Sequence, residues 1–129
     1  MACEPLTHLA ISHEWVGEPL DLALGTAVGR LLTRAEMAAD ERGLVHGGFV
    51  FGLADYAAML AVNDPYVVLG AAETRFLAPV RVGELLTARA VVESAEGQKR
   101  IVKCVVTTDR EVLSATFTCF VLPRHVFDH

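Results

Sequence analysis

The sequence lacks the signals that mark several large classes of protein. It has no basic run longer than Lys99-Arg100 and a formal net charge of −5, which argues against a nucleic-acid partner bound through bulk electrostatics. No apolar run reaches the roughly 18 residues needed to cross a bilayer. The stretch MACEPLTHLA at the start lacks the basic and apolar segments of a signal peptide. We therefore expect a cytoplasmic protein with neither a nucleic-acid nor a membrane partner.

Cysteine is scarce, and its spacing indicates neither a disulfide framework nor a CxxC site. The only cysteines are Cys3, Cys104 and Cys119, an odd number. A tight turn at residues 109–110 would place Cys104 opposite about Ala115 rather than opposite Cys119. We expect buried free thiols in a reducing compartment.

Apolar residues, in contrast, are plentiful. The 129 residues fit one domain, which we place at 1–129 because no repeat, low-complexity tract or linker interrupts the chain. Hydrophobic residues make up 53% of the sequence and charged residues 21%, which is more apolar than an average soluble monomer. On so small a chain, surplus apolar residues indicate burial against other subunits, so we expect a homo-oligomer.

Hydrophobic periodicity predicts an α+β organisation with one central helix. The helix should run from about Phe49 to Val62, because Pro65 cannot continue it, and its lack of a solvated face indicates that it is covered nearly all round. A strand is expected in the first half of 25–39, while 6–15 could be a strand or a short helix. The rest should form a long antiparallel meander that wraps the helix, with strands at 66–76, 85–95, 100–108 and 112–122, a loop at 77–84 and turns at Glu96-Gly97 and Asp109-Arg110.

The segment from 44 to 62, LVHGGFVFGLADYAAMLAV, carries a single carboxylate, Asp55, near its middle. Burying a lone carboxylate costs several kcal/mol unless it is paired or protonated. One interpretation is a buried ion pair, for instance with Arg75 or Arg81. The other is a catalytic carboxylate whose apolar surroundings raise its pKa, as suits a general base or nucleophile.

The dipeptide Gly47-Gly48, preceded by His46, stands where the helix should begin. The first helix N–H groups have no intrahelical partner, and glycines let a ligand approach them closely. Such donors can hold a carbonyl oxygen that becomes an oxyanion, each contributing about 3 to 4 kcal/mol. The alternative is an ordinary tight turn with a histidine that positions it.

The combined motif changes this balance. VHGGFVFGLADYAAMLA resembles the HGG and LAD element of the hot-dog fold acyl-CoA thioesterases, in particular the subgroup typified by phenylacetic acid degradation thioesterases. RFLAPVRVGELLTARAVVESAEGQKRIVKCVV is similar to the strands and Pro-containing loop that follow the helix in that family. The resemblance covers about 42–121. It implies a hot-dog fold, an antiparallel sheet wrapped around one long helix, and hydrolysis of an acyl-CoA thioester to a free acid and coenzyme A.

The resemblance also implies roles for individual residues. Asp55 matches the family's helix aspartate, the base or nucleophile; Gly47 and Gly48 match the glycines that polarise the carbonyl; His46 matches the histidine that orients their loop. The family's site lies between two subunits, which implies a homodimer with shared sites, or a homotetramer. Where many relatives carry an asparagine near the water or thioester, this chain has Asp40.

Further residues are candidates for binding the substrate. Coenzyme A is part of the substrate, so no separate cofactor is expected, and no metal site is expected from the histidines near the end of the chain. The phosphates of coenzyme A need cations, for which the candidates are Arg75, Arg81, Lys99 and Arg100. The acyl tail would be lined by Phe51, Tyr56, Met59 and Phe76.

Two other functions are possible for such a chain. An enoyl-CoA hydratase or dehydratase of the same fold is disfavoured, because the Asp-x-Asn-Pro-x-His pattern of those enzymes is missing and Glu41 stands five residues before His46. A non-catalytic acyl-CoA-binding module would usually carry an attached DNA-binding segment, and the first 40 residues show no basic recognition helix.

Overall fold

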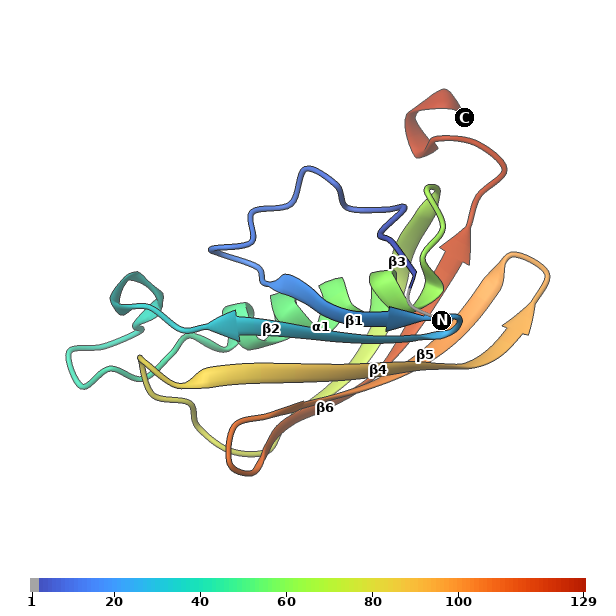
Figure 1. Ribbon diagram of the computed structural model, residues 1–129. Coiled ribbons are helices and arrows are strands. Elements are labelled where there is room, and N and C mark those ends of the chain that lie inside the picture. The colour runs from blue at the N-terminus through green and yellow to red at the C-terminus, as the bar shows by residue number, and fades with distance from the viewer. Residues whose placement is uncertain (1–2) are drawn as a thin grey trace.

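A single long helix lies against one six-stranded antiparallel sheet that curves around it (Figure 1). The structure is a computed structural model that describes residues 3–129, and it confirms the predicted α+β class. In chain order the elements are β1 (Glu18–Ala23), β2 (Thr26–Leu32), the short 3-10 helix η1 (Ala35–Met37), α1 (Gly47–Val62), β3 (Val67–Phe76), β4 (Leu85–Glu96), β5 (Lys99–Thr107), β6 (Glu111–Val121) and the 3-10 helix η2 (Val126–Asp128).

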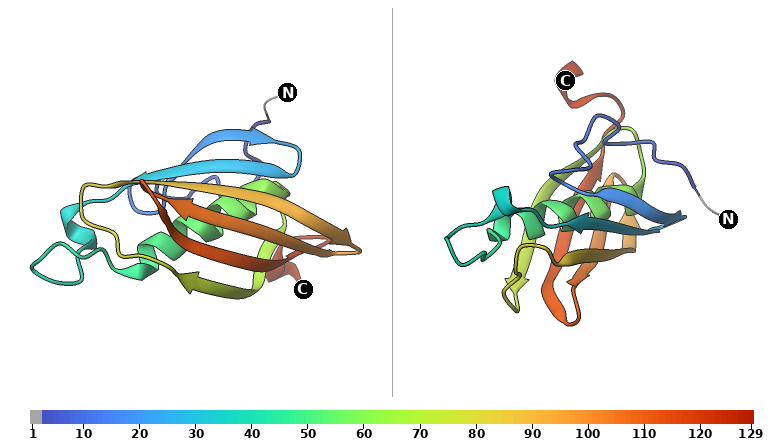
Figure 2. Two further views of the ribbon diagram at one scale, coloured as in Figure 1. Left: turned by 90° about the horizontal axis from the view of Figure 1, so that it is seen from below. Right: turned by 60° about the vertical axis from the view of Figure 1, so that its left-hand side comes forward.

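The order of strands differs from the simple meander that the sequence predicts. It is β1-β2-β4-β5-β6-β3, so β3 lies at an edge beside β6 rather than beside β4, its successor in the chain. The loop 77–84 makes this possible because it passes the β5–β6 turn, where Arg110 Nη2 donates to the Pro79 carbonyl at 2.9 Å. The two edges, β1 and β3, lie on opposite sides of α1 (Figure 2). An edge strand presents unpaired backbone groups to any neighbour.

The long helix α1 begins at Gly47, two residues before the predicted start, and ends where predicted. Its C-cap Asn63 adopts a left-handed conformation with φ 51°, and its N–H donates to the Met59 carbonyl at 2.8 Å. The Asn63 side chain also accepts from Leu6 N and donates to the Glu4 carbonyl. These bonds tie the N-terminal segment to the end of the helix.

Small residues bring the helix and sheet into close contact. Leu53 packs over Gly17 and Gly29: a Cβ built on these glycines would lie 2.7 and 3.5 Å from Leu53 Cδ1. In β4, Leu86, Ala88 and Ala90 are all buried, as the predicted alternation requires. Most of the helix is therefore sealed by its own chain.

The N-terminal region shows what periodicity missed. Residues 6–15 form neither a strand nor a helix but a series of turns, with His8 at φ 55°. The strand β1 was not predicted, because it is a short edge strand, bulged between Pro19 and Asp21, whose sequence EPLDLA alternates only weakly. In residues 3–129 no helix is both long and apolar enough to span a membrane.

The register of β5 and β6 confirms the predicted place of Cys104, whereas Cys3 is exposed and not buried as expected. Cys104 pairs with Ala115, while Cys119 lies opposite Arg100. Both Cys104 and Cys119 are buried thiols with no disulfide between them. Burial raises the pKa of Cys104 to about 12, which makes this thiol unreactive.

Candidate functional site

One stripe of α1 stays open although the rest of the helix is sealed. Gly48, Phe51, Gly52 and Asp55 follow one another at the spacing of one helix face, and each is half-buried or exposed. The residues from Tyr56 to Ala61, in contrast, are all buried. We call these four residues the open stripe. The predicted cover around the helix is thus incomplete within one chain, and the gap contains the carboxylate.

Asp55 has no counter-charge. Its Oδ1 is buried without a hydrogen-bond partner, and in residues 3–129 Asp55 forms no ion pair, with Arg75 and Arg81 included. Burial raises the pKa of Asp55 to about 6, because the charged form loses hydration that nothing replaces. Within residues 3–129 of one chain, Asp55 therefore does not form the structural ion pair that was one of its two interpretations.

The surroundings of Asp55 place it over the end of β6. Burial, and after it the negative charge of Asp55, raise the pKa of the Cys119 thiol to about 11. One turn earlier on the helix, the ring of Phe51 packs against that of Phe117 with centroids 5.7 Å apart. A carboxylate beside a thiol and aromatic rings, with no cation, keeps affinity for a proton near neutral pH.

The Gly47-Gly48 turn is built by close approach rather than by a special backbone conformation. A Cβ on Gly48 would lie 3.0 Å from Cδ2 and Nε2 of His46, and one on Gly47 would lie 3.1 Å from Cε1 of Phe76. His46 is the N-cap, and its backbone N–H donates to the Met37 carbonyl at 2.9 Å. The amides of Gly47 and Gly48 belong to the first helical turn, so they have no intrahelical acceptor.

The carboxylate and the glycine amides are too far apart to act together within one chain. Asp55 follows Gly47 by eight residues, which is about 12 Å along a helix that rises 1.5 Å per residue. A carbonyl group must lie about 3 Å from both its oxyanion donors and its base or nucleophile. Within one chain, these two candidate groups therefore do not meet around one carbonyl group.

Among the residues predicted to line the acyl tail, the structure separates two pairs. Phe51 lies on the open stripe, and Phe76 is exposed beside Gly47. Tyr56 and Met59 are only 2% and 1% exposed and belong to the core. The inward face of β3 also carries Thr74, whose Oγ1 is buried without a partner in the described residues.

The predicted polar and basic residues do not gather at one place. Asp40 Oδ1 accepts the backbone N–H groups of Arg42 and Leu44 at 2.9 and 3.1 Å, so Asp40 stabilises its own loop. Arg75 is exposed on β3. Lys99 and Arg100 begin β5 at the end of the sheet opposite the Gly47 turn (Figure 1).

Arg81 is a predicted cation on the same side of the fold as the Gly47 turn. It lines a hollow together with Arg42 and Arg110, which sequence reasoning missed. The hollow forms because Leu44 bridges to Arg81, a contact between segments far apart in the chain. No local pattern in the sequence signals it.

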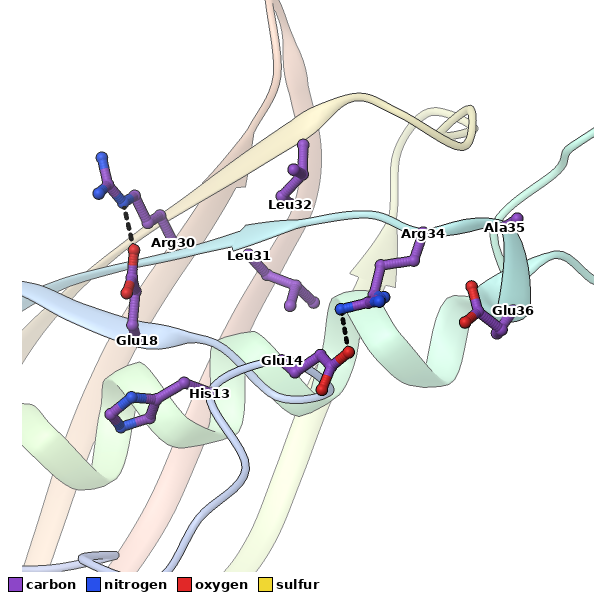
Figure 3. Close-up of a pocket in the computed structure, with 9 residues that line it drawn as sticks. All are labelled: His13, Glu14, Glu18, Arg30, Leu31, Leu32, Arg34, Ala35 and Glu36. Carbon is purple, nitrogen blue, oxygen red and sulfur yellow. Dashed lines mark hydrogen bonds and ion pairs between the residues drawn. The ribbon is translucent and has the colours of Figure 1, made fainter.

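A second hollow, of about 630 Å³, lies over β2 and the N-terminal segment (Figure 3). Its two arginines are already paired: Arg30 Nε meets Glu18 Oε1 at 2.7 Å, and Arg34 pairs with Glu14. Arg34 also stacks over the ring of Trp15. None of the predicted site residues lines this hollow.

Comparison with known proteins identifies the family. Residues 42–115 match the family model described as Thioesterase superfamily. Since this match covers more than half of the chain, the protein belongs to the thioesterase superfamily. Its fold is the hot-dog fold that the sequence resemblance implied.

Solved structures agree with this assignment. An uncharacterized protein from Pyrococcus horikoshii is 50% identical, with a TM-score of 0.98 over 99% of both chains. A mutant of the phenylacetic acid degradation protein PaaI from Thermus thermophilus is 31% identical, with a TM-score of 0.77 over 84% of this chain and 95% of that one. The predicted likeness to phenylacetic acid degradation thioesterases is confirmed.

Curated relatives are longer than this chain. A methylthioribose-1-phosphate isomerase from Aquifex aeolicus is 45% identical over 118 residues, which are 90% of this chain and 26% of that protein. The transcription factor FapR from Thermoanaerobacter sp. is 29% identical over 106 residues, which are 81% of this chain and 53% of that protein. The chain thus spans between about a quarter and about half of these relatives.

Proposed function

We propose that the protein hydrolyses an acyl-CoA thioester to a free acid and coenzyme A. The observation that carries this proposal is Asp55, a half-buried carboxylate with no counter-ion, a pKa raised to about 6 and a position on the open stripe of α1. A carboxylate of this kind can serve as a general base or a nucleophile at neutral pH. Membership of the thioesterase superfamily supports this reaction class.

The two halves of the site join when two chains meet. Asp55 of one subunit would face Gly47 of the partner subunit, because the two groups in one chain lie about 12 Å apart. The edge strand β3 supports such a meeting, since most of its residues are exposed and its unpaired backbone can accept a second strand. We therefore propose a homodimer with shared sites, from which a tetramer can be built.

The chemistry can follow either of two balanced routes. As a base, Asp55 takes a proton from water while the water oxygen bonds to the thioester carbon; the C–S bond then breaks and the sulfur receives that proton. As a nucleophile, Asp55 bonds to the carbon itself, the thiolate leaves and takes a proton from solvent, and water cleaves the anhydride. In both routes the glycine amides hold the negative carbonyl oxygen.

Other side chains would support these steps. We propose that His46 holds the glycine turn in place through its contact with Gly48, and that the unpartnered Thr74 hydroxyl offers a hydrogen bond to the water or thioester. Phe51 and Phe76 are the side chains best placed to line the acyl tail, because Tyr56 and Met59 are already in the core. We place the protein in the cytoplasm, where its buried thiols stay reduced.

Replacing Asp55 tests the proposal directly. Asp55→Asn keeps the shape of the side chain but removes the charge, and should lower kcat for acyl-CoA hydrolysis by about 10² to 10⁴, followed as released thiol. Asp21→Asn, a change at an exposed carboxylate on β1, is the matched control and should keep full activity. Near-full activity in Asp55→Asn would contradict the proposal.

Mixing two inactive variants tests whether the site is shared. Asp55→Asn removes the carboxylate, and Gly47→Pro removes an amide donor. In a mixed dimer one site contains both defects and the other contains neither, so random re-pairing should restore about a quarter of the wild-type activity. Activity that stays at the level of the parents would show that each chain acts alone.

FapR is named as a transcription factor and not as an enzyme, and the likeness to it supports a second candidate: a domain of this superfamily that binds acyl-CoA without turnover. The two functions differ in thiol release: the hydrolase frees coenzyme A, while a binding module retains the intact ester. A hydratase would instead show loss of enoyl-CoA absorbance without free thiol. A panel of short, long and aromatic acyl-CoA esters separates the three.

A further inference from the structure

Three arginines from three separate segments line one hollow near the start of α1. Arg42 comes from the loop before the helix, Arg81 from the β3–β4 loop and Arg110 from the β5–β6 turn, and these three segments line the hollow together. The hollow has a volume of about 350 Å³ and is lined by Asp40, Arg42, Leu44, Pro79, Val80, Arg81 and Arg110.

The backbone that carries these arginines is well fixed. Val45 N donates to the Val80 carbonyl and Val82 N to the Gly43 carbonyl, both at 2.9 Å, which joins the first two segments. Arg81 N donates to Glu84 Oε1 at 2.7 Å. Arg110 Nη2 donates to the Pro79 carbonyl at 2.9 Å, which fixes the third segment. The fold therefore sets the backbone positions of the three arginines.

Two of the three arginines form no ion pair within residues 3–129, and one carboxylate, Asp40, lines the hollow with them. In residues 3–129 the guanidinium groups of Arg42 and Arg81 form no ion pair, whereas Arg110 is paired with Asp109 at 2.8 Å. Asp40, the carboxylate in the lining, uses its Oδ1 to accept two backbone N–H groups of its own loop. Two free guanidinium groups in one concave site are suited to phosphate, which they can bind with paired hydrogen bonds.

An apolar hollow continues from the arginines to the proposed site of reaction. It shares Pro79 and Val80 with the arginine hollow and has a volume of about 400 Å³. Its other lining residues include Gly47 and Phe76. The two hollows thus fit a ligand with phosphates at one end and a long uncharged arm. The phosphates would lie at Arg42 and Arg81, the arm would run along Pro79, and the far end of the arm would reach the Gly47 amide.

We propose that the hollow of Arg42, Arg81 and Arg110 binds the phosphate groups of the coenzyme A part of the substrate. This inference rests on the proposed thioester hydrolysis and assigns the phosphates to these residues instead of Lys99 and Arg100, which lie at the opposite end of β5. The pantetheine arm then passes over Pro79 and Val80, and the thioester arrives beside Gly47.

Two thioesters that share the acyl-pantetheine part, only one of which carries the nucleotide with its phosphates, test the assignment. Acyl-CoA and acyl-pantetheine present the same thioester, so the ratio of their kcat/KM values measures what the nucleotide with its phosphates contributes. The double variant Arg42→Gln/Arg81→Gln should lower this ratio at least tenfold, mainly through KM for acyl-CoA. Arg89→Gln, a change at an exposed arginine on β4, is the matched control and should leave the ratio unchanged.

The assignment would be overturned if Arg42→Gln/Arg81→Gln kept the wild-type ratio of kcat/KM values. It would also be overturned if this ratio fell in Lys99→Gln/Arg100→Gln instead. Titration calorimetry keeps this failure separate from failure of the proposed hydrolysis, because it needs no turnover. The wild type should bind coenzyme A more tightly than pantetheine, and the arginine variant should lose that difference.

A third ester, acyl-4′-phosphopantetheine, carries the single phosphate found on a carrier protein but no nucleotide. If the wild type prefers acyl-CoA to this ester, the nucleotide phosphates are bound at the hollow. If it binds the two esters equally, the assignment to the nucleotide phosphates is refuted.

Discussion

The two faces of α1 differ in how completely the rest of the same chain covers them and pairs their polar groups. On the closed face, Leu53 packs over Gly17 and Gly29, and its neighbours Ala54 and Ala57 are fully buried. On the open stripe, Asp55 is half-buried and its carboxylate lacks a partner. The same helix thus supplies core packing on one side and an unsatisfied polar group on the other.

This contrast separates residues that stabilise the fold from residues available for chemistry. Close packing without voids is what gives a small domain its stability. A buried carboxylate without a partner has the opposite effect, since its desolvation opposes folding. A position that lowers stability and lies in a gap of the structure is a strong candidate for function.

Shortening a side chain on the closed face should have the largest effect on stability. Leu53→Ala leaves a cavity between α1 and the two glycines that Leu53 covers, and should lower the free energy of unfolding by about 2 to 5 kcal/mol. Thermal or urea unfolding measures this change. The folded fraction should keep its kcat, since Leu53 lies away from the open stripe; a loss of kcat in folded protein would show that the two faces are not independent.

Removing the amide donor of Gly47, the residue before the open stripe, should lower catalysis more than stability. Gly47→Pro and Gly47→Ala both place a Cβ 3.1 Å from the Phe76 ring, but only proline lacks the N–H, and the first helical position accepts it. The proline variant should lose about 10² to 10³ in kcat, and the alanine variant much less. Equal losses in the two variants would show that the Phe76 contact matters rather than the amide.

Much of this fold was predictable from local patterns. The apolar segment 49–62 and Pro65 after it predicted the helix and its end, and the alternation in 85–95 predicted β4 and its buried face. The place of Cys104 opposite Ala115 followed from the length of one turn. Each of these features depends on residues close together in the sequence.

The features that were missed depend on contacts between distant segments. The edge position of β3 depends on where the loop 77–84 passes, and the arginine hollow depends on the bridge between Leu44 and Arg81. The gap in the cover of α1 also depends on contacts between distant segments. Hydrophobic periodicity shows which helix residues are apolar, but it does not show which other residues pack on them. Asp55 could be predicted as a candidate, but its lack of a counter-ion needed the fold.

Ionisation of Asp55 should change activity and stability in opposite directions as the pH varies. Asp55 must be ionised to act as base or nucleophile, and burial raises its pKa to about 6. We therefore expect kcat/KM to fall about tenfold per pH unit below an inflection near pH 6.

Stability should change the other way over the same range. The pKa of Asp55 is raised from 3.8 in the unfolded chain to about 6 in the folded one, so the folded state binds more protons between these values. The contribution of Asp55 to stability is thus fully present below about pH 4 and is lost as the pH rises through 6. The comparison is the wild type with Asp55→Asn, by unfolding at pH 4.5 and 7.5: the wild type should lose more stability than the variant between these pH values. If both lose the same amount, the carboxylate is paired in solution, and the contrast between the closed face and the open stripe no longer explains the site.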